Sequence, residues 1–167
     1  MHSFPLDWSH FEEFCRRLIT KEDFKDVYVF TGPAYLPKKD GESKKYYVKY
    51  EIIGNPPNIA VPTHFYKVIL AIKDKIDGDG HLYALGAYIL PNERISNDTP
   101  LQTFDIPLDA LERATGLTFF NQFIKDSSID LCKESKCILV ANPKYVKEEL
   151  RPALPGPSNN NKTSNKD

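Results

Sequence analysis

Residues 65–90, with the sequence FYKVILAIKDKIDGDGHLYALGAYIL, decide the fold of this 167-residue chain. The two ends of the stretch, 65–72 and 82–90, are rich in aromatic and β-branched residues, a composition typical of strands. Between them, Asp77-Gly-Asp-Gly80 has the composition of a hairpin turn. A calcium-binding loop begins in a similar way, but the further Asp or Asn and the closing Glu of such a loop are missing. The stretch therefore predicts two antiparallel strands joined by a tight turn.

Other strands are predicted on both sides of this hairpin. Residues 27–31 are β-branched and aromatic and are stopped by Gly32-Pro33. Residues 46–53 have the same composition and are closed by Gly54-Asn-Pro-Pro57. A last, short strand is predicted at 137–140, where Ile, Leu and Val follow a cysteine.

Two helices flank the predicted strands. The segment 7–19 repeats apolar residues at helical spacing and begins with Asp7, a residue type that caps helices. The segment 107–115 has Pro107 near its start and Gly116 just beyond its end, as helices prefer. The apolar stripe of the first helix consists of Trp8, Phe11, Cys15 and Leu18. Strands in hairpin succession with flanking helices predict the α+β class, with a mostly antiparallel sheet.

The composition indicates one domain at 1–150 and a disordered tail at 151–167. Hydrophobic residues make up 41% of the chain, which suffices for a single core, whereas the tail is Pro, Asn, Ser and Lys with almost nothing apolar. The net charge of −1 excludes a strongly basic nucleic-acid coat protein. It leaves open an enzyme that meets phosphates only in a local cleft.

The chain has 3 cysteines, and this odd number argues against a secreted fold built on disulfides. Cys132 and Cys137 are close in sequence and could be free thiols, a local disulfide or part of a zinc site. A zinc site needs two more ligands nearby, and none is evident, so we favour free thiols first and a disulfide second. No apolar run approaches the ~20 residues of a membrane span. Residues 1–7 resemble neither a signal peptide nor an arginine-rich transit peptide.

Five blocks of the sequence occur in the same order in one known family. From Trp8 to Gly116, and more weakly to Cys137, the chain resembles the C-terminal portion of the mitochondrial endonuclease G-type DNA/RNA non-specific nucleases. Leu131-Cys-Lys-Glu134 is similar to the fungal branch of that family. The five blocks are 27–37 (VYVFTGPAYLP), 48–54 (VKYEIIG), 61–67 (VPTHFYK), 90–92 (LPN) and 106–117 (IPLDALERATGL).

This resemblance implies the ββα-metal (His-Me finger) nuclease fold, of which the chain would hold the C-terminal portion. It also implies Mg²⁺-dependent hydrolysis of phosphodiester bonds in DNA and RNA, with little preference for sugar or sequence. Residence in the mitochondrion and assembly into a homodimer are further properties that the resemblance implies.

The family's motif transfers to three residues of the first helix. Trp8 matches the Trp that opens the motif, Glu12 the Glu that orients metal-bound waters, and Arg16 the Arg that contacts phosphate. A carboxylate in that place acts on the metal through water, and a guanidinium offers a planar fork to phosphate oxygens. The alternative is an ordinary surface ion pair, because residues four apart are neighbours on one helix face.

The rest of the family's catalytic machinery is missing from the sequence. The Asp-Arg-Gly-His motif that supplies the general base does not occur, and the metal-binding Asn position holds Phe4, which has no oxygen for Mg²⁺. None of the four histidines takes the place of that base; they are His2, His10, His64 and His81. We therefore expect little activity from this chain alone. It is either an incomplete piece of a normal nuclease or a catalytically silent nucleic-acid-binding or dimerisation module.

Nucleic acid is the partner that the resemblance implies, and four basic residues are the predicted contacts. Arg16 and Arg17 lie on the first helix, and Lys38 and Lys39 begin a lysine-rich loop. A solvated hairpin tip explains the two lysines equally well. A sheet that lacks its first strands would also expose an edge, which favours pairing with another chain.

Overall fold

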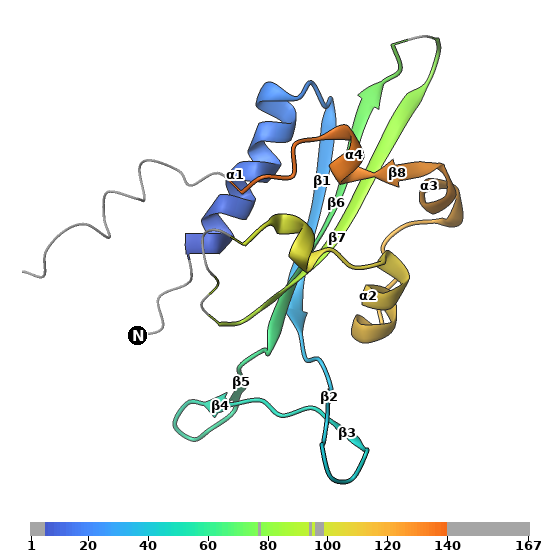
Figure 1. The fold of residues 1–167 in the computed structure, drawn as a ribbon. Coiled ribbons are helices and arrows are strands. Elements are labelled where there is room, and N and C mark those ends of the chain that lie inside the picture. Colours follow the sequence, from blue (N-terminus) through green and yellow to red (C-terminus); the bar gives the residue numbers. More distant parts are fainter. Residues whose placement is uncertain (1–5, 77, 94, 96–98, 140–167) are drawn as a thin grey trace, which may run out of the picture.

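The structure is a computed structural model and describes residues 6–76, 78–93, 95 and 99–139 (Figure 1). Phe4, residue 140 of the predicted strand at 137–140, and the predicted tail at 151–167 lie outside these ranges. The elements along the chain are α1 (Leu6–Lys21), β1 (Asp26–Ala34), β2 (Lys38–Lys39), β3 (Tyr46–Tyr47), β4 (Ile52–Ile53), β5 (Ile59–Ala60), β6 (His64–Asp74), β7 (His81–Pro91), the 3-10 helix η1 (Leu101–Phe104), α2 (Leu108–Thr115), α3 (Gln122–Ser127), β8 (Ser128–Asp130) and α4 (Leu131–Glu134).

The predicted central hairpin is confirmed as β6 and β7, which pair antiparallel along their whole length, from His64 opposite Pro91 to Asp74 opposite His81. The turn between them contains Gly78 and Gly80, whose φ angles are 129° and 121°. Glycine adopts such angles without the strain that a β-carbon would cause. The glycines of the turn therefore allow the chain to reverse.

The main sheet has the order β1-β6-β7-β8. β1 pairs antiparallel with β6, and β8 pairs parallel with β7, with Tyr83 opposite Ser128. The predicted α+β class with a mostly antiparallel sheet is thereby confirmed, although β8 was not predicted. In the described part of the chain, the outer edge of β1 carries no paired strand.

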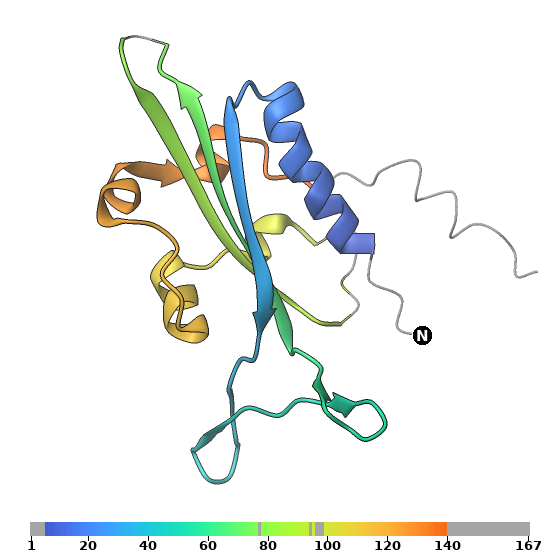
Figure 2. The same ribbon diagram turned by 180° about the vertical axis from the view of Figure 1, so that it is seen from behind.

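Helices cover both faces of the sheet, as Figures 1 and 2 show from opposite sides. The side chains of β6 alternate between the faces, so Ile69 packs with α1 and Val68 packs on the face of α2. The core on the α1 face includes Phe11, Phe14, Leu18, Phe24, Ile69, Tyr88, Leu101 and Leu131. The core on the α2 face includes Ala34, Tyr66, Val68, Ala87 and Leu111. Burial on both faces explains why residues 68–72 of β6 form an unbroken apolar run.

The predicted strand at 46–53 is wrong. The structure places β3 and β4 there, each two residues long, and each pairs in a separate small hairpin, β2-β3 or β4-β5. Every residue from 41 to 60 is exposed, so the aromatic and β-branched composition is not matched by a buried face. The two hairpins form a lobe, residues 38–60, that projects from one end of the main sheet (Figure 1).

The helix predictions hold with one correction. α2 begins after Pro107 and ends at Gly116, whose φ is 74°, as predicted. α1 begins at Leu6, so Asp7 lies within the helix and is not its cap. No strand forms at 137–139, the described part of the predicted strand at 137–140, because these residues instead cross beside α1.

Candidate functional site

α1 carries the two residues that the sequence assigns to catalysis. Its apolar side chains, among them Phe11 and Phe14, are buried against the sheet. Glu12 and Arg16 are exposed and lie four residues apart, so they are neighbours on one helix face. The helix therefore presents a carboxylate and a guanidinium together on its exposed side.

The Arg16 guanidinium pairs with a neighbouring carboxylate on the same helix. Its Nη2 and Nε atoms lie 2.8 and 3.0 Å from Oε2 of Glu13, and 55% of its side chain is exposed. An exposed pair at this spacing contributes only about 0.2–0.5 kcal/mol. The pair with Glu13 therefore holds the guanidinium only weakly.

Lys67 of β6, which is not among the predicted site residues, lies beneath α1. The residue is only 3% exposed, and its Nζ lies 4.1 Å from the ring centroid of Trp8 and 5.0 Å from that of Phe11. Burial lowers the pKa of Lys67, and electrostatic interaction with Cys15 and Glu12 opposes that shift. An ammonium group in this place is held by cation–π contacts to the motif tryptophan. The signal in the sequence is a lone lysine in the apolar run 65–72.

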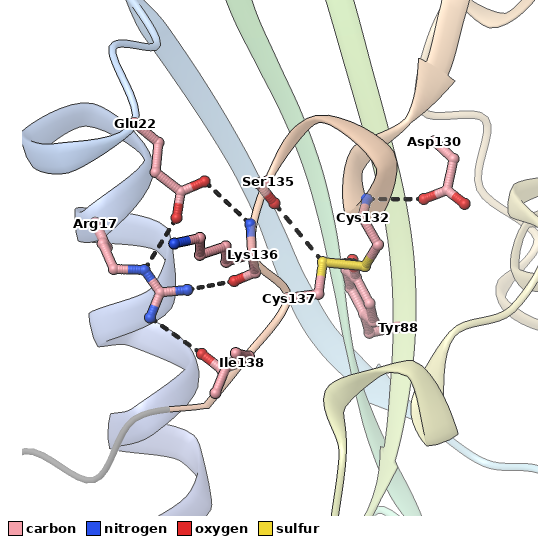
Figure 3. Close-up of a disulfide and its surroundings, with 9 residues drawn as sticks. All are labelled: Arg17, Glu22, Tyr88, Asp130, Cys132, Ser135, Lys136, Cys137 and Ile138. Atoms are coloured by element: carbon pink, nitrogen blue, oxygen red, sulfur yellow. Dashed lines mark hydrogen bonds and ion pairs between the residues drawn. A yellow bond between two sulfur atoms is a disulfide. The ribbon is translucent and has the colours of Figure 1, made fainter.

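The Arg17 side chain is largely buried and its guanidinium group is bound by other parts of the chain, so the structure does not support its predicted contact with nucleic acid. Its Nε lies 3.1 Å from Oε1 of Glu22, and its terminal nitrogens donate to the carbonyl oxygens of Lys136 and Ile138 (Figure 3). The backbone N–H of Lys136 donates to the same Glu22 side chain at 3.3 Å. Arg17 and Glu22 thus fasten residues 131–139, here called the C-terminal strap, to α1.

A disulfide joins Cys132 and Cys137 and closes the strap on itself (Figure 3). The preference for two free thiols was therefore wrong. Sequence spacing alone could not decide between the states, because the sulfur atoms meet only when α4 ends and the chain turns back. The hydroxyl oxygen of Tyr88 lies 3.3 Å from Sγ of Cys132, and burial raises the pKa of that hydroxyl. The disulfide therefore rests on the core of the sheet.

Lys38 and Lys39 border a hollow between the lobe and the end of the sheet. The hollow has a volume of about 500 Å³, and its lining includes Lys38, Lys39, Asp40, Tyr47, Lys49 and His64. We call it the lysine hollow. Burial lowers the pKa of His64, and the nearby charge of Lys38 adds to the effect. The structure thus brings the two predicted lysines together with a third, Lys49, and with an aromatic ring.

Three of the four histidines, His10, His64 and His81, lie among the residues that the structure describes. His10 is 3% exposed, and its Nε2 has no hydrogen-bond partner among the described residues. His81 Nδ1 lies 2.9 Å from Asp74 Oδ1 beside the β6-β7 turn. His64 Nδ1 lies 2.9 Å from Thr63 Oγ1. His10 and Glu12 are two positions apart on α1, so their side chains do not face each other.

The described residues do not fit a complete Mg²⁺ site. No group of three or more His, Cys, Asp or Glu side chains in this part of the chain could hold a metal ion. Glu12 is a single exposed carboxylate, whereas Mg²⁺ prefers several oxygen ligands in octahedral geometry. No catalytic step can therefore be assigned to a metal held by these residues alone.

Comparison with known proteins identifies the class to which this fold and helix belong. A family model described as DNA/RNA non-specific endonuclease matches residues 6–125. In a crystal structure of the EndoG/EndoGI complex, concerned with the mechanism of EndoG inhibition, a chain that is 44% identical superposes with a TM-score of 0.62 over 72% of this chain and 46% of its own. The α+β arrangement is therefore that of the His-Me finger nucleases.

Curated relatives narrow the assignment further. The mitochondrial nuclease of Saccharomyces cerevisiae is 49% identical over 133 residues, which cover 80% of this chain and 40% of the yeast protein. Human mitochondrial endonuclease G is 38% identical, over 67% of this chain and 35% of its own length. The chain belongs to the DNA/RNA non-specific endonuclease family. It spans less than half the length of these relatives. No helix in the described ranges is long and apolar enough to cross a membrane.

Proposed function

We propose that the chain is the portion of a Mg²⁺-dependent, sugar-non-specific endonuclease that carries the motif helix, and that the whole protein hydrolyses phosphodiester bonds in DNA and RNA. The observation that carries this proposal is the family match over residues 6–125, which includes α1 with Glu12 and Arg16 exposed on one face. Because relatives are named mitochondrial nucleases, we place the whole protein in the mitochondrion. We also expect it to act as a homodimer.

Each of the two exposed residues has a defined task in this proposal. The Glu12 carboxylate orients water at the reacting centre through its oxygens. The Arg16 guanidinium binds phosphate oxygens by paired, charge-assisted hydrogen bonds. Lys67 supports them from below, since its ammonium group fixes Trp8 one turn before Glu12.

The 167 residues alone should have little activity. The sequence lacks the Asp-Arg-Gly-His motif, and a general base contributes roughly 10²–10⁴-fold to the rate. The second candidate function, a catalytically silent nucleic-acid-binding or dimerisation module, is favoured by Phe4 at the position of the metal-binding Asn.

A chimeric nuclease separates the two candidates. Residues 6–125 of this chain replace the matching segment of the Saccharomyces cerevisiae mitochondrial nuclease, which then supplies the missing motifs. We expect the chimera to nick supercoiled plasmid and to cleave RNA with Mg²⁺ but not with EDTA. Glu12→Gln and Arg16→Ala should each lower kcat/KM by roughly 10–100-fold. Arg113→Ala is the matched control, because Arg113 is an exposed helix arginine paired with Asp109 at 2.6 Å.

Two results would contradict the proposal. A folded chimera without activity, beside an active yeast parent, would favour the silent module. Vigorous nicking by the 167-residue chain alone, abolished by Glu12→Gln, would show that the expected dependence on the missing motifs is wrong.

A further inference from the structure

We propose that the lysine hollow binds an unpaired polynucleotide strand, with phosphates on its lysines and a base stacked on Tyr47. The ligand class rests on the proposed function, but the binding itself requires no cleavage. The hollow's volume of about 500 Å³ falls within the ~300–1,000 Å³ of pockets that hold small ligands. It is therefore large enough to receive part of a flexible strand.

The charge of the hollow favours a polyanion. Lys38, Lys39 and Lys49 line it, within a chain whose net charge is −1. Of the two acidic residues in the lining, Asp40 faces its own turn, since its Oδ2 accepts hydrogen bonds from the hydroxyl and N–H of Ser43 at 2.7 and 3.4 Å. Glu93 is the other. Positive charge therefore prevails at the hollow, although the protein as a whole is slightly acidic.

The pairing of β2 with β3 brings an aromatic ring to the same place. Lys38 is opposite Tyr47, and Lys39 is opposite Tyr46. The side chains of directly paired residues in an antiparallel ladder are neighbours, so the ring of Tyr47 lies beside Lys38. Tyr47 lines the hollow and is 43% exposed, whereas Tyr46 does not line it. A ring beside an ammonium group is the arrangement that binds a base and its phosphate together.

This arrangement selects an unpaired strand over a duplex. In a duplex each base is stacked between its neighbours and cannot offer a face to Tyr47, whereas bases of a single strand can splay out and stack on aromatic side chains. Stacking does not distinguish deoxyribose from ribose, so DNA and RNA strands should bind alike.

The position of the hollow connects it with the motif helix. His64, the first residue of β6, lines the hollow. The next residue, Phe65, contacts Trp8 of α1 with ring centroids 5.8 Å apart. The hollow and the N-terminal half of α1 therefore lie at the same end of the sheet, so a strand held in the hollow is kept close to the end that carries Glu12.

The test is a binding titration of the full 167-residue chain in EDTA, which prevents metal-dependent cleavage. Fluorescence anisotropy follows fluorescein-labelled dT12, rU12 and a 12-base-pair duplex at several salt concentrations. We expect dT12 and rU12 to bind with similar affinity and more tightly than the duplex. Three lysine–phosphate contacts predict a slope of log K against log salt of about −2.

Matched variants test the residues. Tyr47→Ala should weaken dT12 binding by roughly 10-fold or more, Tyr47→Phe should restore it, and Tyr46→Ala should change it little. Lys38→Ala/Lys49→Ala should flatten the salt slope, whereas Lys25→Ala/Lys75→Ala, which removes two positive charges beyond the far end of β6, should not.

Several outcomes overturn the proposal. These are no binding of dT12, duplex binding as tight as dT12 binding, or equal effects of Tyr46→Ala and Tyr47→Ala. If Tyr47→Ala changes the oligomeric state in sedimentation while dT12 binding persists, the hollow is a protein contact instead. Because the chimera tests cleavage independently, failure of the hollow leaves the proposed nuclease function standing.

Discussion

Removal of the Cys132–Cys137 disulfide should lower the stability of the chain by a modest, calculable amount. The two cysteines are separated by 5 positions, so the disulfide closes a short loop. The loss of chain entropy in the unfolded state that such a loop causes corresponds to about 2 kcal/mol at 25 °C. In a domain of this size, that difference corresponds to roughly 4–8 °C in Tm.

Equilibrium urea unfolding, followed by tryptophan fluorescence, measures this difference. The oxidised chain is compared with the chain in dithiothreitol and with the Cys132→Ser/Cys137→Ser variant. We expect reduction and the double substitution to lower the free energy of unfolding by similar amounts. Dithiothreitol should not affect the double variant, which serves as the control for non-specific effects of the reductant.

The loss of stability on reduction should be concentrated in the strap. The N–H of Lys136 donates to Glu22, Arg17 holds the carbonyls of Lys136 and Ile138, and Glu134 pairs with Lys73 of β6, so the strap keeps these attachments after reduction. Hydrogen exchange should therefore quicken in the strap more than in β6 and β7. A change in unfolding free energy below about 0.5 kcal/mol, or dithiothreitol sensitivity of the double variant, would refute the reasoning.

Two further predictions concern buried positions. Gly86→Ala should destabilise the chain by roughly 1–3 kcal/mol in thermal unfolding, because a β-carbon there would lie 2.6 Å from the hydroxyl oxygen of Tyr88, which is packed in the core. Gly41→Ala, with nothing within 4 Å, is its control, and equal effects would contradict the clash. Lys67→Met should remove a pH dependence of the free energy of unfolding. Burial lowers the pKa of Lys67 in the folded chain below its ordinary value of 10.5, so the unfolded chain binds more protons between the two pKa values. The stability of the wild-type chain therefore rises as the pH increases from the folded pKa towards 10.5. Urea unfolding between pH 7 and pH 10 checks this, and an unchanged slope in the variant would count against it.

Local sequence patterns predicted the central hairpin and the helices α1 and α2 well. β6 and β7 are adjacent in sequence, their turn is marked by glycines, and burial on both faces makes the middle of each strand largely apolar. The same composition misled the prediction at 46–53. There the aromatic and β-branched residues are exposed. The composition favours strands, but no buried face is present for these side chains to pack against, and a long strand does not form.

Contacts between distant segments could not be predicted. β8 is three residues long and forms only because α3 brings Ser128 beside Tyr83 of β7. Arg16 and Arg17 are adjacent and chemically identical in the sequence. Arg17 is internal because its carbonyl partners come from residues 136 and 138.

For the candidate site, helical spacing combined with the family resemblance was sufficient to predict that Glu12 and Arg16 share one face of α1, where the structure leaves both exposed. It was not sufficient for Lys67, whose role depends on the ring of Trp8 lying across it. The lysine hollow likewise depends on tertiary structure, because it combines lobe residues with His64 at the end of β6.

The bond from Arg17 to Ile138 spans 121 positions of the chain and brings its first helix beside its last described segment. Leu6 lies 11 residues before Arg17, which is about 16 Å along a helix. A linker of about six extended residues covers that distance. A short linker can therefore join the strap to the start of α1. A circularly permuted chain with its new ends at the exposed tip of the lobe, near Gly41, should retain the sheet, the strap and the motif helix.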